Sequence, residues 1–440
     1  MLREFVSAAR RRAAATATAG VSAFALIVPL GAVGPAVHPV PSHAAPAPVR
    51  AHEVGPPSDT RLPQATGLYT TWCTGRGACL GGGNYADASG SVQPMVAAQA
   101  GGRWQHGTRL VLPANAGEQP YAQVNGVACR SAGNCVAVGN YTYDPQHNVG
   151  AFIASEASGG WAPAFTPQLP ADAVSPPRAR LAAVTCRPDG FCAAVGSYQA
   201  KTGQIQAMVV TKPAGQAWGR ATEITPPASA IASPDAALTG IDCTGPGSCV
   251  AVGHYNDGPS ATRGMGVVET GGSWGRATGI PAPRGSVASS FTGFSSVSCR
   301  PYGECLAVGV FAVDGTRDSA MSVTEFNGSF GTAAAITAVP AGAAARPSTA
   351  LSGIACPRRG PCVAAGVATN AAGHYVAMYA TRSHGRWAAD FLTGPANVSV
   401  GKDEQSSLFS VSCGSRDFCT AVGYYNDTTG GYGAAAISTR

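Results

Sequence analysis

Charged residues are scarce in this sequence. Asp, Glu, Lys and Arg together make up 12% of its 440 residues, and only three lysines occur, at Lys201, Lys212 and Lys402. The formal net charge is +6, of which the first twelve residues supply +3 through four arginines and one glutamate. The remaining positive charge is weak and dispersed, so we expect no nucleic-acid partner.

The motifs of common catalytic sites are also absent. The sequence contains no His-Glu-x-x-His and no Gly-Lys-Ser/Thr loop. Its eight histidines are scattered, and Asp403-Glu404 is the one adjacent carboxylate pair. We therefore predict no catalytic residues, no metal site and no cofactor.

What the sequence does contain is a repeat marked by cysteine. All 14 cysteines fall into seven Cys-x5-Cys pairs, and the first cysteines of successive pairs lie 56 or 57 residues apart. A fixed period of this length indicates one supersecondary unit per repeat, stacked or closed into a ring. The pairs are Cys73-Cys79, Cys129-Cys135, Cys186-Cys192, Cys243-Cys249, Cys299-Cys305, Cys356-Cys362 and Cys413-Cys419.

Each pair brackets a five-residue turn, which favours a disulfide between neighbouring strands. A structural zinc site needs four ligands, whereas each repeat offers two cysteines and no recurrent histidine. Thioredoxin-type redox motifs use the tighter Cys-x-x-Cys. We predict seven bridges, each contributing about 2 kcal/mol in the loop-entropy model.

Each of the first six repeats has the pattern of four antiparallel strands. In the third repeat they are expected at 181–186, 192–198, 206–211 and 218–225, separated by turns rich in Gly and Pro. No helical period occurs after the N-terminal region. The fold class is therefore all-β, a seven-bladed β-propeller with four strands per blade.

The seventh repeat ends at its third strand, so the ring needs a strand from elsewhere. Residues 50–57 (RAHEVGPP) align with residues 220–227 (RATEITPP) of the third repeat. We predict that residues 48–55 form the outer strand of the last blade and close the ring.

Residues 1–44 have the pattern of an export signal. Arg10, Arg11 and Arg12 precede an apolar stretch, and Ser42-His43-Ala44 is a small-x-small cleavage site. We expect cleavage after Ala44, by the general secretory or the twin-arginine route, leaving residues 45–440 as one domain. An uncleaved N-terminal anchor is the alternative. The expected location is extracellular or in the cell envelope, with no membrane span after cleavage.

Variable loops should share the face opposite the cysteine turns, and such loops are the usual place for binding. A recurrent aromatic ends the second strand, and an acidic residue often follows it. The candidate ligand-binding residues are Tyr85, Tyr141, Asp144, Tyr255, Asp257, Tyr425, Asp427, Arg178 and Arg180. The competing interpretation is packing between blades for the tyrosines and turn formation for the aspartates.

The turns before the fourth-strand aromatics resemble the Asp-box (BNR) turn of sialidase-like propellers, as in Ser158-Gly-Gly-Trp161, although the Asp is missing in every copy. The Cys-x5-Cys-x-Ala-Val-Gly repeat is similar to that of secreted bacterial propellers with no assigned activity. The arginine triad, Tyr-Glu pair and acidic residue of sialidases have no matching positions here.

We therefore expect a monomeric secreted propeller that binds an extracellular glycan, a cell-wall component or a protein without catalysis. The alternatives are a polysaccharide hydrolase or lyase acting on the loop-rich face, and a structural role in an envelope assembly.

Overall fold

The computed structural model describes residues 51–438 except 63, 144–147, 402–403 and 416–417. Within these ranges the chain forms strands and turns and no α-helix. It follows that no described helix is long and apolar enough to cross a membrane. The expected signal at 1–44 and the candidate residue Asp144 lie outside the described residues, so both stay predictions.

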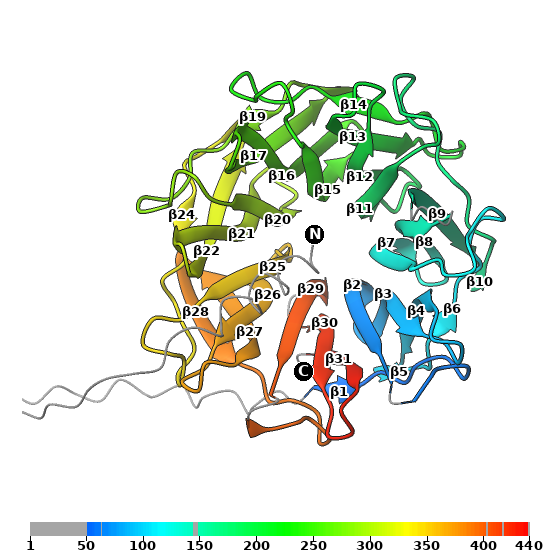
Figure 1. Ribbon diagram of the computed structural model, residues 1–440, viewed down its shortest axis with the longest axis vertical. Coiled ribbons are helices and arrows are strands. Elements are labelled where there is room, and N and C mark those ends of the chain that lie inside the picture. The colour runs from blue at the N-terminus through cyan, green and yellow to red at the C-terminus, as the bar shows by residue number, and fades with distance from the viewer. Residues whose placement is uncertain (1–50, 63, 144–147, 402–403, 416–417, 439–440) are drawn as a thin grey trace, which may run out of the picture. The chain divides into compact units, whose positions relative to one another are not determined.

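Seven antiparallel sheets stand around a central axis as the blades of a propeller (Figure 1). Blade 1 consists of β2 (Thr66–Gly75), β3 (Ala78–Ala86), β4 (Val92–Ala100), β5 (Arg103–Trp104) and β6 (Thr108–Arg109). Blade 2 consists of β7 (Gln123–Ser131), β8 (Asn134–Thr142), β9 (Val149–Ala157) and β10 (Gly160–Trp161). Blade 3 consists of β11 (Ala179–Cys186), β12 (Cys192–Gln199), β13 (Ile205–Lys212) and β14 (Thr222–Ile224).

The remaining blades repeat this order. Blade 4 consists of β15 (Ala237–Gly245), β16 (Ser248–Gly258), β17 (Ala261–Thr270), β18 (Ser273–Trp274) and β19 (Thr278–Gly279). Blade 5 consists of β20 (Thr292–Cys299), β21 (Cys305–Asp314), β22 (Arg317–Phe326), β23 (Ser329–Phe330) and β24 (Ala334–Ala335). Blade 6 consists of β25 (Thr349–Ala355), β26 (Cys362–Thr369), β27 (Tyr375–Ser383) and β28 (Arg386–Phe391). Blade 7 consists of β29 (Ser406–Ser415), β30 (Phe418–Asn426), β31 (Tyr432–Ser438) and β1 (His52–Glu53).

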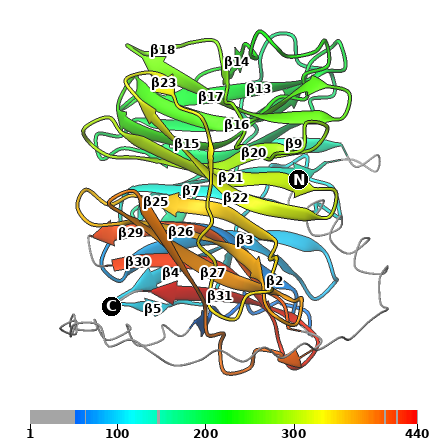
Figure 2. The same cartoon turned by 90° about the vertical axis from the view of Figure 1, so that its left-hand side faces the viewer.

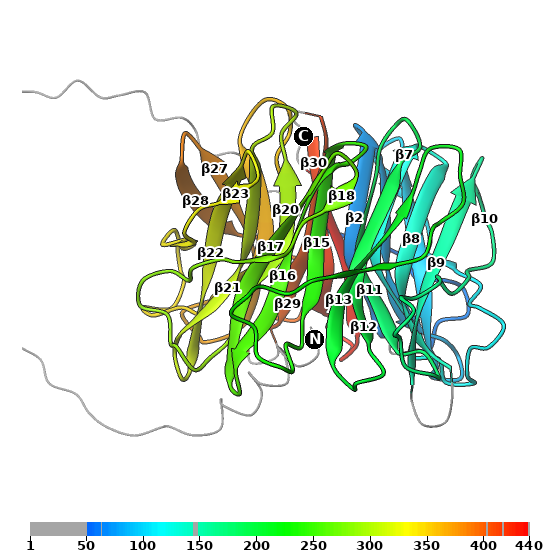
Figure 3. The ribbon, with the colours of Figure 1, turned by 90° about the horizontal axis from the view of Figure 1, so that it is seen from above.

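The first strand of each repeat is innermost, and the strands run between the two faces of the ring (Figure 3). We call the face with the cysteine turns the hairpin face, and the face with the second-to-third loops and the long connections the loop face. The predicted fourth strand is continuous in blade 6. In blades 1, 4 and 5 it is split into two short pieces that both pair with the third strand.

The N-terminal strand closes the ring, as predicted, with β1 spanning His52–Glu53; residues 48–50 of the expected strand lie outside the described residues. His52 and Glu53 of β1 pair with Ala436 and Ala435 of β31. The amide of Val54 donates to the Ala434 carbonyl at 3.0 Å, and the Val54 side chain is 1% exposed. This strand occupies the place that β14 holds in blade 3, which confirms the alignment of residues 50–57 with 220–227.

Apolar clusters fill the seams between neighbouring blades. One of them joins Val54 and Ala436 of blade 7 to Leu68, Tyr85 and other residues of blade 1, so the closing strand is part of the core. Six comparable clusters occupy the other six seams. Because each blade buries its faces only against its neighbours, the ring is stabilised as a whole.

All seven predicted disulfides are present, and no described cysteine is free. Cys73 and Cys79, for example, face each other directly in the register of β2 and β3. The Cα–Cα distances of the bridges run from 3.9 to 4.2 Å. These distances are shorter than is usual for disulfides because the cysteines sit opposite each other on adjacent strands.

Candidate functional site

The recurrent tyrosines lie inside the seams and do not line a surface. Tyr85, Tyr141, Tyr255 and Tyr425 are at most 3% exposed. Each packs in the cluster that joins its own blade to the preceding one. Their rings are therefore not accessible to a ligand, and these tyrosines pack between neighbouring blades.

The tyrosine hydroxyls hold the long connections in place. Tyr85 donates to Asp59 at 2.9 Å, and Tyr198 donates to Asp172 at 2.9 Å and to Glu223 at 3.1 Å. Burial, together with the Asp172 hydrogen bond and the charge of Glu223, raises the pKa of Tyr198 well above its usual range.

Blades 5 and 6 lack this hydroxyl, since their residues at the tyrosine position are Phe311 and Ala368. The polar partner is missing there too. Asp59 and Asp172 lie 26 residues before their tyrosines, and the corresponding positions hold Gly285 and Gly342, with φ of 84° and 81°. In these blades the tyrosine hydroxyl and its polar partner in the long connection are therefore either both present or both absent.

The candidate aspartates shape turns. Asp427 is 5% exposed and accepts hydrogen bonds from the amides of Thr429 and Gly431. Burial opposes ionisation of Asp427, but these bonds outweigh it and hold its pKa below the ordinary value. Asp257 pairs with Arg263 at 3.0 Å. Asp427 and Asp257 lie on blades 7 and 4, so the structure does not bring them together.

Arg178 and Arg180 are exposed at the start of the inner strand of blade 3. Arg178 donates to the side chain of Gln199 at 3.2 Å. They lie on the loop face, as expected, but no other candidate residue of the described set is in contact with them.

A β-bulge interrupts every inner strand near the loop face. In β2 the register shifts between Leu68 and Thr70, so Tyr69 has no partner on β3. Such bulges re-aim a side chain and are frequent beside functional sites. The bulged residues are Tyr69, Asn125, Ala182, Thr239, Ser295, Ser352 and Phe409.

Two of these seven bulged residues are aromatic, and the closed ring makes them neighbours. The ring centroids of Tyr69 and Phe409 are 5.2 Å apart across the seam of blades 1 and 7. Phe409 stacks on Tyr424 at 5.6 Å, and Tyr424 meets Tyr432 edge-on at 6.0 Å. We call these four residues the aromatic strip. It runs from the inner strands outward across blade 7.

The aromatic strip is partly exposed and has polar groups beside it. Tyr432 is 38% exposed, and the other three rings are partly exposed. The Tyr69 hydroxyl donates to Asn84 at 3.3 Å. At the other end Gln64 accepts from the Tyr432 amide with its carbonyl and donates to Glu53 with its side chain.

The aromatic strip does not follow from the residues that recur in the repeat. The strip consists of positions that vary between repeats. The bulged residue and the residue five after the second cysteine are both aromatic in repeat seven alone, and the bulged residue is also aromatic in repeat one. A repeat-by-repeat alignment combined with ring closure is the signal that could have found it.

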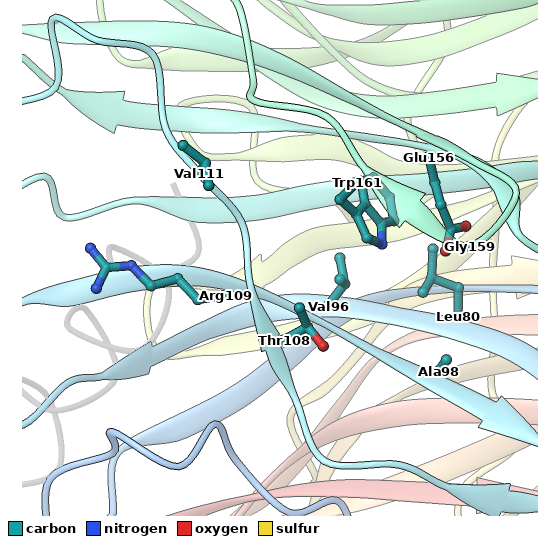
Figure 4. Close-up of a pocket in the computed structure, with 9 residues that line it drawn as sticks. All are labelled: Leu80, Val96, Ala98, Thr108, Arg109, Val111, Glu156, Gly159 and Trp161. Atoms are coloured by element: carbon teal, nitrogen blue, oxygen red, sulfur yellow. The ribbon is translucent and has the colours of Figure 1, made fainter.

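A cavity of about 320 Å³ opens between blades 1 and 2 (Figure 4). Leu80, Val96 and the indole of Trp161 form apolar walls, and Glu156 lies beside Gly159. Burial raises the pKa of Glu156. Glu156 is the one carboxylate among the described lining residues. Glycoside hydrolysis typically uses two carboxylates, so the cavity by itself lacks that machinery.

Metal binding has no support in the described part of the chain, where no group of three or more His, Cys, Asp or Glu side chains converges. The disulfides use the cysteines, and the candidate aspartates are held in turns or ion pairs.

Neither a protein-family model nor a curated protein matches the sequence. Among solved structures, a protein of unknown function from Dyadobacter fermentans is 12% identical, with a TM-score of 0.44 and coverage of 75% of this chain and 98% of that one. A Hadza microbial sialidase is 10% identical, with a TM-score of 0.43 and coverage of 86% and 65%. A xyloglucanase from Xanthomonas campestris is 11% identical, with a TM-score of 0.43 and coverage of 84% and 52%.

This chain thus spans less than two thirds of the sialidase and about half of the xyloglucanase. The fold and the site described above rest on the geometry of this chain alone. That geometry defines the protein as a seven-bladed, disulfide-linked β-propeller.

Proposed function

We propose that this protein is a secreted propeller that binds an extracellular glycan through the aromatic strip. The observation that carries the proposal is the row of ring contacts that joins Tyr69, Phe409, Tyr424 and Tyr432 on the loop face. Aromatic side chains combine a flat apolar face with, in tyrosine, a polar edge. The C–H face of a sugar ring can pack on the apolar face of the aromatic ring, and the sugar hydroxyls can hydrogen-bond to the tyrosine hydroxyl.

The surroundings of the strip agree with this chemistry. Small-molecule sites combine apolar surface with a few polar groups that fix orientation. Asn84 lies beside Tyr69, and Gln64 and Glu53 lie beside Tyr432. A neutral or weakly polar sugar chain could therefore lie along the strip and hydrogen-bond at both ends. The seven disulfides support a location in an oxidising compartment outside the cell.

A glycan array probed with the full chain tests the proposal. For the best ligand, Tyr432→Ala and Tyr424→Ala are each expected to weaken binding about tenfold, equivalent to about 1.4 kcal/mol. Tyr375→Ala is the matched control. Tyr375 opens the third strand of blade 6 as Tyr432 opens that of blade 7, and their exposures are 37% and 38%. Equal losses in all three variants, or no bound glycan on the array, would contradict the proposal.

The second candidate is a polysaccharide hydrolase or lyase, and one observation favours it. Glu156 has a raised pKa and lies beside Trp161 in the cavity between blades 1 and 2. A carboxyl group of this kind can act as a general acid. Release of reducing ends from a bound polysaccharide, abolished by Glu156→Gln, would support this function. Binding without product release would leave the binding function.

A further inference from the structure

The hairpin face of blade 6 gathers arginines that are dispersed along the sequence. Arg358 and Arg359 lie in the turn between β25 and β26. Arg382 pairs with Cys362 across β27 and β26, and Arg386 pairs with Ser383 across the next turn. Because both turns lie at the same end of one blade, four guanidinium groups share that end.

Blade 5 adds a fifth arginine. Arg300 donates to the Gly360 carbonyl of blade 6 at 3.0 Å, and its guanidinium lies 6.0 Å from the ring centroid of Tyr302. Tyr302 is 61% exposed. Figure 2 shows blades 5 and 6 side by side, in yellow to orange. We call Arg300, Arg358, Arg359, Arg382 and Arg386 the arginine patch.

The arginines of the patch outnumber the acidic residues of the turns that carry them. Within the described residues none of its five arginines forms an ion pair, whereas Arg109, Arg263, Arg317 and Arg346 elsewhere in the ring all contact aspartates. The two turns of blade 6 that carry the patch contain no acidic residue. On blade 5, Glu304 is partly exposed in the same turn as Arg300 and forms no ion pair within the described residues. Glu325 is 3% exposed and accepts a hydrogen bond from the Gly328 amide at 2.6 Å.

We propose that the arginine patch binds an anionic polysaccharide. Arginine forks match the geometry of carboxylate, sulfate and phosphate groups. The five guanidinium groups are spread over three turns rather than converging on one point, so a polymer with repeated charges fits them better than a single ion. Tyr302, beside Arg300, offers an exposed aromatic ring for contact with a sugar ring.

This inference does not rest on the aromatic strip, which lies on the loop face. The patch would hold the protein to an acidic polymer by its hairpin face and leave the loop face open. Loss of glycan binding at the aromatic strip would therefore leave the arginine patch proposal standing, and the absence of polyanion binding would leave the aromatic strip proposal standing.

The test measures binding of the full chain to polygalacturonate at several salt concentrations, with dextran as the uncharged polymer. Binding to polygalacturonate alone is expected, and it should weaken as salt rises because bound counterions are released. Arg358→Ala/Arg359→Ala should lower the affinity at least tenfold and reduce the salt dependence. Both side chains are exposed and have no hydrogen-bond partner in the described structure, so the melting temperature should not change.

The matched control is Arg61→Ala/Arg284→Ala, which removes two exposed arginines from the long connections of the opposite face and changes the net charge equally. Its affinity should stay within about twofold of that of the unmodified protein. An equal loss in both double variants would overturn the proposal, because net charge alone would then explain the binding. Tighter binding to vesicles with 30% phosphatidylglycerol, or to a single-stranded oligonucleotide at the same charge concentration, would also overturn it.

Discussion

His254 should make the stability of the propeller fall in mild acid. Its side chain is 6% exposed on β16, and its ring lies 5.8 Å from that of Phe291, at the entry to blade 5. Burial lowers the pKa of His254 from 6.5 to about 4. The neutral imidazole is therefore the form that the fold accepts.

The magnitude follows from these two pKa values. A depressed folded-state pKa gives stability that is fully present above the unfolded-state value of 6.5 and is lost as pH falls toward 4. Linkage gives a loss of about 2 kcal/mol by pH 5 and about 3 kcal/mol by pH 4. Such a loss is a large fraction of the stability of an ordinary domain.

The comparison that isolates His254 is urea unfolding of the unmodified chain and of His254→Val between pH 7.5 and 4. Valine stands at the equivalent place in blades 5 and 6, as Val310 and Val367, so the blade tolerates it. The difference in unfolding free energy between the two proteins should change by about 3 kcal/mol over this range. A difference that stays constant with pH would refute the assignment of a buried neutral histidine.

Three further outcomes are expected. Tyr198→Phe should lower the unfolding free energy by about 1.5–3 kcal/mol, measured in urea, because it removes a hydroxyl bonded to two carboxylates; Phe311→Tyr, which faces Gly285, should bring no gain. Val54→Asp should lower the melting temperature by more than 10 °C, since a buried charge is placed in the closing seam; an unchanged melt would mean that β1 does not close the ring. Intact mass should rise by two hydrogens per bridge on full reduction, and the melting temperature should fall, with about 2 kcal/mol lost per bridge; free thiols before reduction would contradict this.

Local chemistry made much of the fold predictable. The Cys-x5-Cys spacing located each inner hairpin, and the match between residues 50–57 and 220–227 located the closing strand. The bulge at Tyr69 was not predictable, because an extra residue in one strand leaves the hydrophobic pattern almost unchanged. The sequence leaves ligand binding and packing between blades both open for Tyr85, because its place at a strand end is visible in sequence, whereas its burial depends on the neighbouring blade.

The candidate site was harder to predict for the same reason. Arg358 and Arg382 are 24 positions apart, and only the pairing of β26 with β27 brings them to one end of blade 6. Tyr69 and Phe409 belong to opposite ends of the chain, and their contact depends on ring closure. Sequence periodicity shows what the blades share, while function is expected where they differ.

The seam between blades 1 and 7 forms only when residues from both ends of the chain fold together. The amide of Thr71 donates a hydrogen bond to the hydroxyl oxygen of Ser410, 339 residues away. The adjacent rings of Tyr69 and Phe409 likewise meet only when both ends of the chain are present. A polypeptide released early from the ribosome, or clipped between blades 6 and 7, would keep most of its blades and disulfides but lack the joined aromatic surface. The glycan binding proposed for that surface would therefore require a chain that has folded from end to end.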